Sequence, residues 1–155
     1  MKFYSSMKLN TLDEKDAMII TEDPVRPELD YEFRTNNGRQ VYTLKTGDNI
    51  DAVLCVGYTD QIPTTVEELD LYAWPEFNDP PMIAVFYTVW SYSKGAGRKI
   101  IFDVVDRIKE EKSNSPMRYV TLSPKTKMAY RFHTRNGAIL LRTNNVTDNY
   151  EYINV

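Results

Sequence analysis

The feature that most constrains the fold is an apolar segment that runs through a glycine-containing loop into an amphipathic pattern. Residues 82–90 read MIAVFYTVW and predict a strand that is buried on both faces at the centre of a sheet. The next residues include Gly95 and Gly97, and residues 97–112 then repeat apolar side chains at helical spacing. These side chains are Ile100, Ile101, Val104, Val105 and Ile108. A buried strand joined directly to a helix is typical of an α/β protein.

Shorter strands and helices are predicted on both sides of this unit. Strands are expected at Lys2–Lys8, within a meander at Tyr31–Asp60, at Arg118–Leu122, and as a final pair at Ile139–Arg142 and Tyr150–Ile153. Helices are expected at 11–20, where Thr11 and Glu14 match a capping box, at 64–74, opened by Thr64 or Thr65, and at Thr126–Asn136, stopped by Gly137. The order of elements predicts an α/β (α+β) fold with a mixed sheet.

Length and residue usage set the broad class of the protein. All 155 residues, 1–155, are expected to form a single domain, because a chain of this length can bury one core. No apolar run is long enough to cross a membrane, and the N-terminus lacks a signal-peptide pattern. One cysteine, Cys55, and one histidine, His133, argue against a disulfide and against a zinc site. Cys55 lies in the apolar run AVLCVGY, which predicts a buried thiol, and a cytoplasmic location is the default expectation.

Charge is distributed unevenly along the chain. Residues 1–93 carry 7 Lys/Arg and 16 Asp/Glu, whereas residues 94–155 carry 12 and 6. Residues 113–147 contain no acidic residue at all. The basic residues of that stretch are Arg118, Lys125, Lys127, Arg131, Arg135 and Arg142. Such a pattern favours a small polyanionic ligand or nucleic acid on the C-terminal half, or else a merely solvated basic face, and charge alone does not decide between them.

The glycine loop, residues 94–99, could bind a phosphate group. Glycines before a helix bring unpaired backbone N–H groups close to an anion, and Lys94, Arg98 and Lys99 add positive charge. Plain turn chemistry explains the same glycines. The nucleoside-triphosphate loop is absent, because neither Gly95 nor Gly97 precedes Lys-Ser or Lys-Thr. The dinucleotide motif is absent too, because its third glycine would fall at Ile100.

The loop and the segment after it resemble the GNAT superfamily of acyl-CoA-dependent N-acyltransferases. In that family the fourth strand enters a loop R/Q-x-x-G-x-G/A, and Gly95 and Gly97 occupy its glycine positions, with Tyr92 where Arg or Gln is usual. About 30 residues later, "TKMAYRFHTRNGA" follows the frame of a second GNAT signature, N-x-x-A-x-x-x-Y-x-x-x-G-F. Its matched positions are Thr126, Ala129, His133, Gly137 and Ala138, of which Ala129 and Gly137 are identical.

The resemblance implies a fold, a cosubstrate and a set of roles. It implies a mixed, mostly antiparallel sheet of about six or seven strands flanked by about four helices. The cosubstrate would be acetyl-CoA, with the pantetheine arm along Val89, Trp90 and Ser91. The pyrophosphate would lie on Lys94, Gly95, Ala96, Gly97, Arg98 and Lys99. His133 stands where many members have the tyrosine that protonates the leaving thiolate, and an imidazolium could do the same. His133 could equally be a structural helical histidine.

The acceptor and the general base stay open. The acceptor would be a small-molecule or protein amine, and the acidic N-terminal half suits a cationic one. Acidic residues that could face it are Glu67, Glu68, Asp70, Glu76 and Asp79. A second reading rests on the likeness of "YRFHTRNGAIL" to small GNAT-like bacteriophage proteins: a catalytically silent protein with a virion or host-binding role, located in host cytoplasm or virion. Nucleic-acid binding lacks a motif, and the acidic pI of about 5.2 argues against it.

Overall fold

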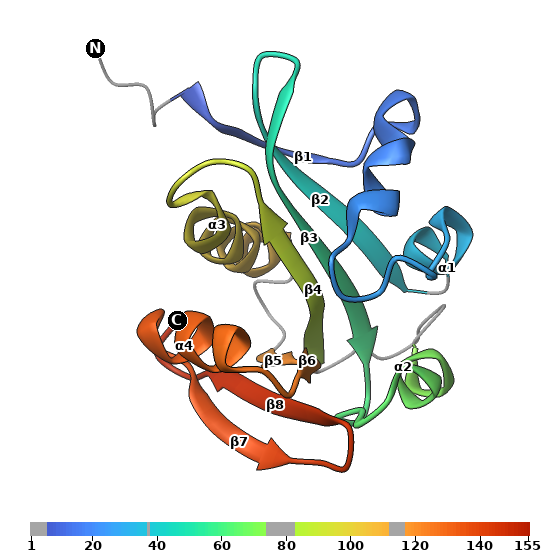
Figure 1. Ribbon diagram of the computed structural model, residues 1–155, viewed down its shortest axis with the longest axis vertical. Helices are drawn as coiled ribbons and strands as arrows, with labels where there is room; N and C mark the ends of the chain where they lie inside the picture. The colour runs from blue at the N-terminus through green and yellow to red at the C-terminus, as the bar shows by residue number, and fades with distance from the viewer. Residues whose placement is uncertain (1–5, 37, 74–82, 112–116) are drawn as a thin grey trace.

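Strand β4 (Ile83–Ser91) lies in the interior of the sheet and connects its two halves. The computed structural model describes residues 6–36, 38–73, 83–111 and 117–155. In these residues an eight-stranded sheet has the order β1-β2-β3-β4-β5-β8-β6, with β7 paired to β8 (Figure 1). The other strands are β1 (Lys8–Thr11), β2 (Arg39–Thr46), β3 (Asn49–Thr59), β5 (Arg118–Thr121), β6 (Ser123–Pro124), β7 (Ile139–Thr143) and β8 (Thr147–Tyr152). Only the β4–β5 pair is parallel.

Helices cover both faces of the sheet (Figure 1). They are the 3-10 helix η2 (Glu14–Glu22), α1 (Tyr31–Thr35), α2 (Val66–Tyr72), α3 (Ala96–Glu111) and α4 (Lys127–Arg135). Helices η2, α1 and α2 lie on one face, and α3 and α4 lie on the other. The predicted mixed, mostly antiparallel sheet with helices on both faces is therefore confirmed, although it has one strand more than expected because the two-residue β6 pairs with β8.

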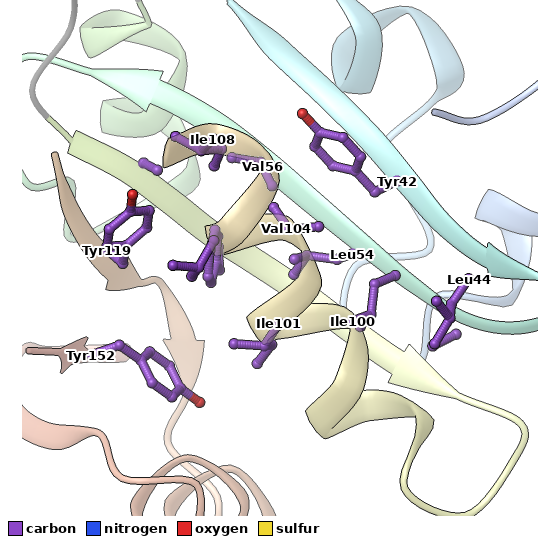
Figure 2. Close-up of a cluster of buried hydrophobic side chains, with 14 of the residues drawn as sticks. Tyr42, Leu44, Leu54, Val56, Ile100, Ile101, Val104, Ile108, Tyr119 and Tyr152 are labelled. Atoms are coloured by element: carbon purple, nitrogen blue, oxygen red, sulfur yellow. The ribbon is translucent and has the colours of Figure 1, made fainter. Parts of the chain in front are cut away.

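The apolar stripe of α3 forms one of the two hydrophobic cores. Its predicted residues, from Ile100 to Ile108, are all buried, and they pack on Leu54 and Val56 of β3 and on Tyr119 of β5 (Figure 2). Burying side chains of this size stabilises the fold by roughly 1.5–3 kcal/mol each. The second core lies on the opposite face, where Val53, Cys55 and Val85 meet residues of η2, α1 and α2. Cys55 is buried, as the sequence predicts.

Several N-terminal predictions are wrong. Thr11 does not cap a helix, because it pairs with Tyr42 as the last residue of β1. The N-cap of η2 is Asp13, whose side chain makes no capping bond. The first strand begins at Lys8 rather than ending there; residues 1–5 of the predicted strand lie outside the described part.

The meander prediction holds for β2 and β3 but fails at its start. Residues 31–35 alternate like a strand yet form α1, because the Asp30 carboxylate accepts a hydrogen bond from the Phe33 amide at 2.8 Å. The helices opened by Thr65 and Thr126 and the α4 stop at Gly137 (φ 96°) are confirmed. Residues 75–81, which the sequence predicts to be a loop between the helix at 64–74 and the central strand, lie outside the described residues.

Candidate functional site

Strands β4 and β5 pair over four residues and then separate, and we call this separation the fork. The last paired residues are Phe86 and Thr121, followed by one hydrogen bond from the Leu122 amide to the Phe86 carbonyl at 3.1 Å. Beyond that point β4 continues to Ser91 with β3 as its only strand neighbour in the described residues. The main chain of residues 89–91 therefore presents an edge that can accept an extended ligand.

A bulge in β4 marks the start of the fork. The register with β3 shifts between Cys55 and Val56, so that these residues pair with Thr88 and Phe86 and leave Tyr87 without a partner in β3. A bulge bends the strand and increases its twist. The bulge falls directly after Phe86, the last residue of β4 that pairs with β5, so it coincides with the start of the fork.

Arg26 bridges the two separating strands on the face of the sheet that is covered by η2 and α1. Its Nη1 donates to the Tyr87 carbonyl and to Thr88 Oγ1 (3.3 Å), and its Nη2 donates to the Leu122 carbonyl at 3.0 Å. The side chain is buried, and burial lowers the pKa of its guanidinium. One arginine thus satisfies a main-chain acceptor on each arm of the fork and fixes their separation.

Arg26 is itself held by a second buried arginine and a buried aspartate. Asp23 Oδ1 accepts from the amides of Val25 and Arg26, and its Oδ2 accepts from Arg34 Nη1 at 2.8 Å. Arg34 also donates to the Arg26 carbonyl (2.6 Å) and to Cys55 Sγ (3.3 Å). The Asp23 and Arg34 side chains are completely buried. Burial raises the pKa of the Cys55 thiol to about 11, so it is protonated at neutral pH and is no nucleophile.

The glycine loop leaves backbone donors free at the start of α3. The Ala96 amide donates to the Ser93 carbonyl, and the Lys99 amide donates to the Gly95 carbonyl. No described residue accepts from the amides of Gly97 or Arg98. Gly95 has φ 80°, a conformation that favours glycine, and the backbone turns there into the helix. The loop therefore offers two adjacent N–H groups at the positive end of a 16-residue helix.

A glycine is required at position 97 for packing as well as for the access of a ligand to the backbone amides. A Cβ at this position would lie 3.2 Å from Cε1 of Phe132 in α4 and 3.6 Å from Oγ of Ser91 in β4. The start of α3, the end of β4 and α4 consequently meet at one point. Val89 also packs against the α3 core, and Trp90 is buried on the other face.

The three basic side chains of the glycine loop differ in the contacts that they make with other residues. Lys94 is exposed. Arg98 donates to Asn136 Oδ1 at 3.0 Å and lies 4.8 Å from the Phe102 ring centroid, while Lys99 pairs with Asp103 at 2.9 Å. Surface pairs of this kind contribute little and exchange readily. All three cations remain within one helical turn of the free amides.

His133 is buried rather than free to titrate near neutral pH. Its Nδ1 lies 2.8 Å from the Tyr152 hydroxyl, and its ring stacks on Tyr150 with centroids 5.1 Å apart. Burial lowers the pKa of the imidazole to about 4. The expectation of an imidazolium at neutral pH is therefore wrong, because desolvation favours the neutral ring.

The structure gives Tyr92 and two of the acidic candidates, Glu68 and Asp70, other partners. The Tyr92 hydroxyl donates to Glu22 Oε1 (2.6 Å) and accepts from Trp90 Nε1 (2.9 Å), so Tyr92 joins β4 to η2 and not to the loop amides. Glu68 accepts from Thr64, and Asp70 pairs with Arg39. Glu67 is exposed, and Glu76 and Asp79 lie outside the described residues.

Sequence reasoning missed Arg26, Glu22 and Tyr152. Arg26 lies in the polar stretch DPVRPE, where arginine is ordinary, and its partners are 61 and 96 residues away. No described group of His, Cys, Asp and Glu could hold a metal ion. None of the helices in the described part of the chain has the length and apolarity that crossing a membrane requires.

A mixed sheet with a fork beside a glycine loop defines the GNAT fold, and comparison with solved structures supports this assignment. A GNAT-family protein from Desulfovibrio desulfuricans superimposes with a TM-score of 0.61 at 14% identity, over 94% of this chain and 97% of that chain. An acetyltransferase from Bacillus subtilis in complex with CoA gives a TM-score of 0.59 at 9% identity, over 94% and 95% of the two chains.

Another similar structure is malonyl-CoA decarboxylase from Rhodopseudomonas palustris, with a TM-score of 0.72 at 19% identity. The match covers 97% of this chain and 60% of that one. The chain spans between 34% and 60% of the three malonyl-CoA decarboxylases that it resembles. No protein-family model matches the sequence, and no curated protein sequence does. The chain therefore has the GNAT fold, which it shares with enzymes of more than one activity.

Proposed function

We propose that the protein is an acyl-CoA-dependent N-acyltransferase that transfers an acetyl group from acetyl-CoA to a primary amine. The observation that carries the proposal is the fork between β4 and β5 next to two free amides at the start of α3. An extended thiol arm needs an unpaired strand edge, and a pyrophosphate needs convergent N–H donors and positive charge. Both requirements are met within residues 89–99 of one continuous segment.

Each part of this segment has a role in the proposal. The main chain of Val89, Trp90 and Ser91 binds the pantetheine arm as an added strand. The amides of Gly97 and Arg98 hold the pyrophosphate, with Lys94 and Lys99 supplying charge. An amide on the same strand edge can polarise the thioester carbonyl, because a fixed donor stabilises the negative charge that develops on that oxygen.

In the reaction the amine nitrogen bonds to the acyl carbon, the carbon–sulfur bond breaks, and the amine proton ends on the departing thiolate or on solvent. We place His133 in this step as the partner of Tyr152 rather than as the acid itself. A neutral imidazole is a poor acid, and burial also makes the Tyr152 hydroxyl a weaker acid by raising its pKa. The hydroxyl, 2.8 Å from His133 Nδ1, can donate a hydrogen bond to the developing thiolate, while the proton itself comes from the amine or from solvent.

The acceptor amine would approach from the face covered by η2 and α1. Glu22 is exposed there, at the end of the Trp90–Tyr92–Glu22 hydrogen-bond chain. A carboxylate in this place attracts an ammonium group, which agrees with the acidic character of the N-terminal half. A small-molecule or protein amine with additional positive charge is the acceptor class that this arrangement favours.

Thermal unfolding with acetyl-CoA, succinyl-CoA and free CoA tests the proposal. A ligand that binds only the folded state raises the melting temperature, so acetyl-CoA and free CoA should both do so. The same titration on Gly97→Leu should show no rise. If the wild-type protein shows no rise at millimolar coenzyme, the chain is not an acyltransferase, and the catalytically silent reading replaces the proposal.

A further inference from the structure

A second concave site lies beside α4, and we call it the α4 pocket. It has a volume of about 500 Å³. Its lining residues are Lys125, Thr126, Lys127, Tyr130, Arg131, Asp148 and Tyr150. They come from the start of α4 and from β8, which run next to each other in the lower part of Figure 1.

The α4 pocket is separate from the glycine loop. Phe132 is the α4 residue that contacts Gly97. Tyr130 precedes it by two positions, which is about 200° around an α-helix. The side of α4 that lines the pocket therefore faces away from the loop, and the body of the helix separates the two sites.

Two buried polar atoms at the α4 pocket lack partners among the described residues. They are the Tyr150 hydroxyl and Asp148 Oδ1. Tyr150 has 0% of its surface exposed. The Tyr150 ring lies 6.4 Å from the Tyr130 ring, centroid to centroid, and both residues line the pocket. An unsatisfied buried polar group costs roughly 1–3 kcal/mol, so a ligand that bonds to both atoms recovers this energy.

Positive charge and free amides converge on the same place. The lining contains three cations, Lys125, Lys127 and Arg131, and one carboxylate, Asp148, which gives a net charge of about +2. At the start of the nine-residue α4, Thr126 Oγ1 accepts from the Ala129 amide at 3.1 Å. No described residue accepts from the amides of Lys127 or Met128. Free amides at a helix N-terminus favour an anion.

We propose that the α4 pocket binds a small phosphate monoester whose organic part carries hydroxyl groups. A phosphate monoester carries close to two negative charges at neutral pH, which matches the lining charge. The amides of Lys127 and Met128 and the cations hold the phosphate. Asp148 Oδ1 accepts from a hydroxyl of the ligand's organic part, which inorganic phosphate lacks, and the Tyr150 hydroxyl gains its missing partner. The site is distinct from the fork and from the glycine loop, although its Tyr150 stacks on His133.

The test is a titration of ¹⁵N-labelled protein with glycerol 3-phosphate at constant ionic strength, followed by NMR. The amide signals of Lys127 and Met128 should shift, while those of Gly97 and Arg98 stay in place. Glycerol alone should shift neither set, and inorganic phosphate should bind at least tenfold more weakly. Shifts only at Gly97 and Arg98, or equal affinity for inorganic phosphate, would overturn the proposal.

Matched variants test the residues. Lys127→Glu should weaken the binding of glycerol 3-phosphate at least tenfold, while Lys109→Glu, the same charge change at an exposed position of α3, leaves it unchanged. Tyr150→Phe should weaken binding without lowering the melting temperature of the free protein, because the lost hydroxyl has no partner there. Equal affinity in wild type, Lys127→Glu and Tyr150→Phe would refute the site even if the protein binds phosphate elsewhere.

Discussion

Phe132 of α4 packs directly on Gly97 of α3, so that a Cβ on Gly97 would lie 3.2 Å from the edge of the phenyl ring. This contact joins the α4 helix to the start of the glycine loop. It explains why glycine is needed at a position whose φ is not in the left-handed region, in contrast to Gly95.

Gly97→Val should lower the free energy of unfolding by about 1–3 kcal/mol, because the added methyls overpack the contact with Phe132. In a double-mutant cycle measured by urea unfolding, Phe132→Ala should recover a substantial part of that loss. Gly95→Ala is the matched control. A Cβ at position 95 would have no atom within 4 Å. Gly95→Ala should therefore lower the free energy of unfolding only by the cost of an alanine in the left-handed backbone conformation, roughly 1–2 kcal/mol, and Phe132→Ala should not reduce that loss. Additive effects at Gly97 and Phe132 would contradict the packing explanation.

The burial of His133 makes stability depend on pH. The folded pKa of about 4 lies below the ordinary 6.5, so the unfolded chain binds the proton more readily. The free energy of unfolding therefore keeps its full value with respect to His133 above pH 6.5. It decreases as the pH falls towards 4, by roughly 3 kcal/mol in total. Urea unfolding from pH 4 to pH 7.5 should show a steeper loss for wild type than for His133→Gln. Parallel curves would mean that His133 titrates normally in the folded protein.

Removal of the Asp23 charge should be strongly destabilising, because the fully buried Arg34 guanidinium would lose its only carboxylate among the described residues. We expect Asp23→Asn to reduce the free energy of unfolding by about 3–5 kcal/mol in denaturant titrations. Asp70→Asn provides the comparison: it also breaks an arginine–aspartate pair, but Asp70 is half exposed, and the expected loss is below about 1 kcal/mol. Similar losses in both variants would show that burial of the pair is unimportant.

Arg26 should govern coenzyme affinity as well as stability. Arg26→Met keeps the aliphatic stem but leaves the Tyr87 and Leu122 carbonyls without a donor, and we expect a loss of about 2–4 kcal/mol in stability. At a temperature where the variant is folded, its Kd for acetyl-CoA by calorimetry should rise about tenfold, near 1.4 kcal/mol. Arg39→Met, another buried arginine of the same face, should lose stability with unchanged Kd.

Sequence patterns predicted the elements that are determined by interactions between residues close together in the chain. The almost wholly apolar β4, the apolar stripe of α3 and the caps at Thr65 and Thr126 act over a few residues, and each was predicted correctly. Segment 31–35 was missed because its alternation resembles a strand, while the decisive interactions are the Asp30 cap and the burial of Arg34 against Asp23 and Cys55.

The candidate site was predictable only where it is continuous in sequence. Residues 89–99 supply both the strand edge and the free amides, so one motif indicates them together. The neutral state of His133 depends instead on Tyr150 and Tyr152, which lie 17 and 19 residues further on, and periodicity carries no information about that contact. Arg26 shows the same limit, because only the folded sheet brings its acceptors together.

The reach of Arg26 has a consequence for biosynthesis. Its guanidinium bonds to carbonyls 61 and 96 residues downstream, and both belong to the arms of the fork. While the chain emerges from the ribosome, Arg26 lacks the second of these acceptors until Leu122, 96 residues further on, has been made. The bridge between the two strands can therefore form only after Leu122 has been made, and a nascent chain stalled before Leu122 should display an intact β2–β3 hairpin but no coenzyme affinity.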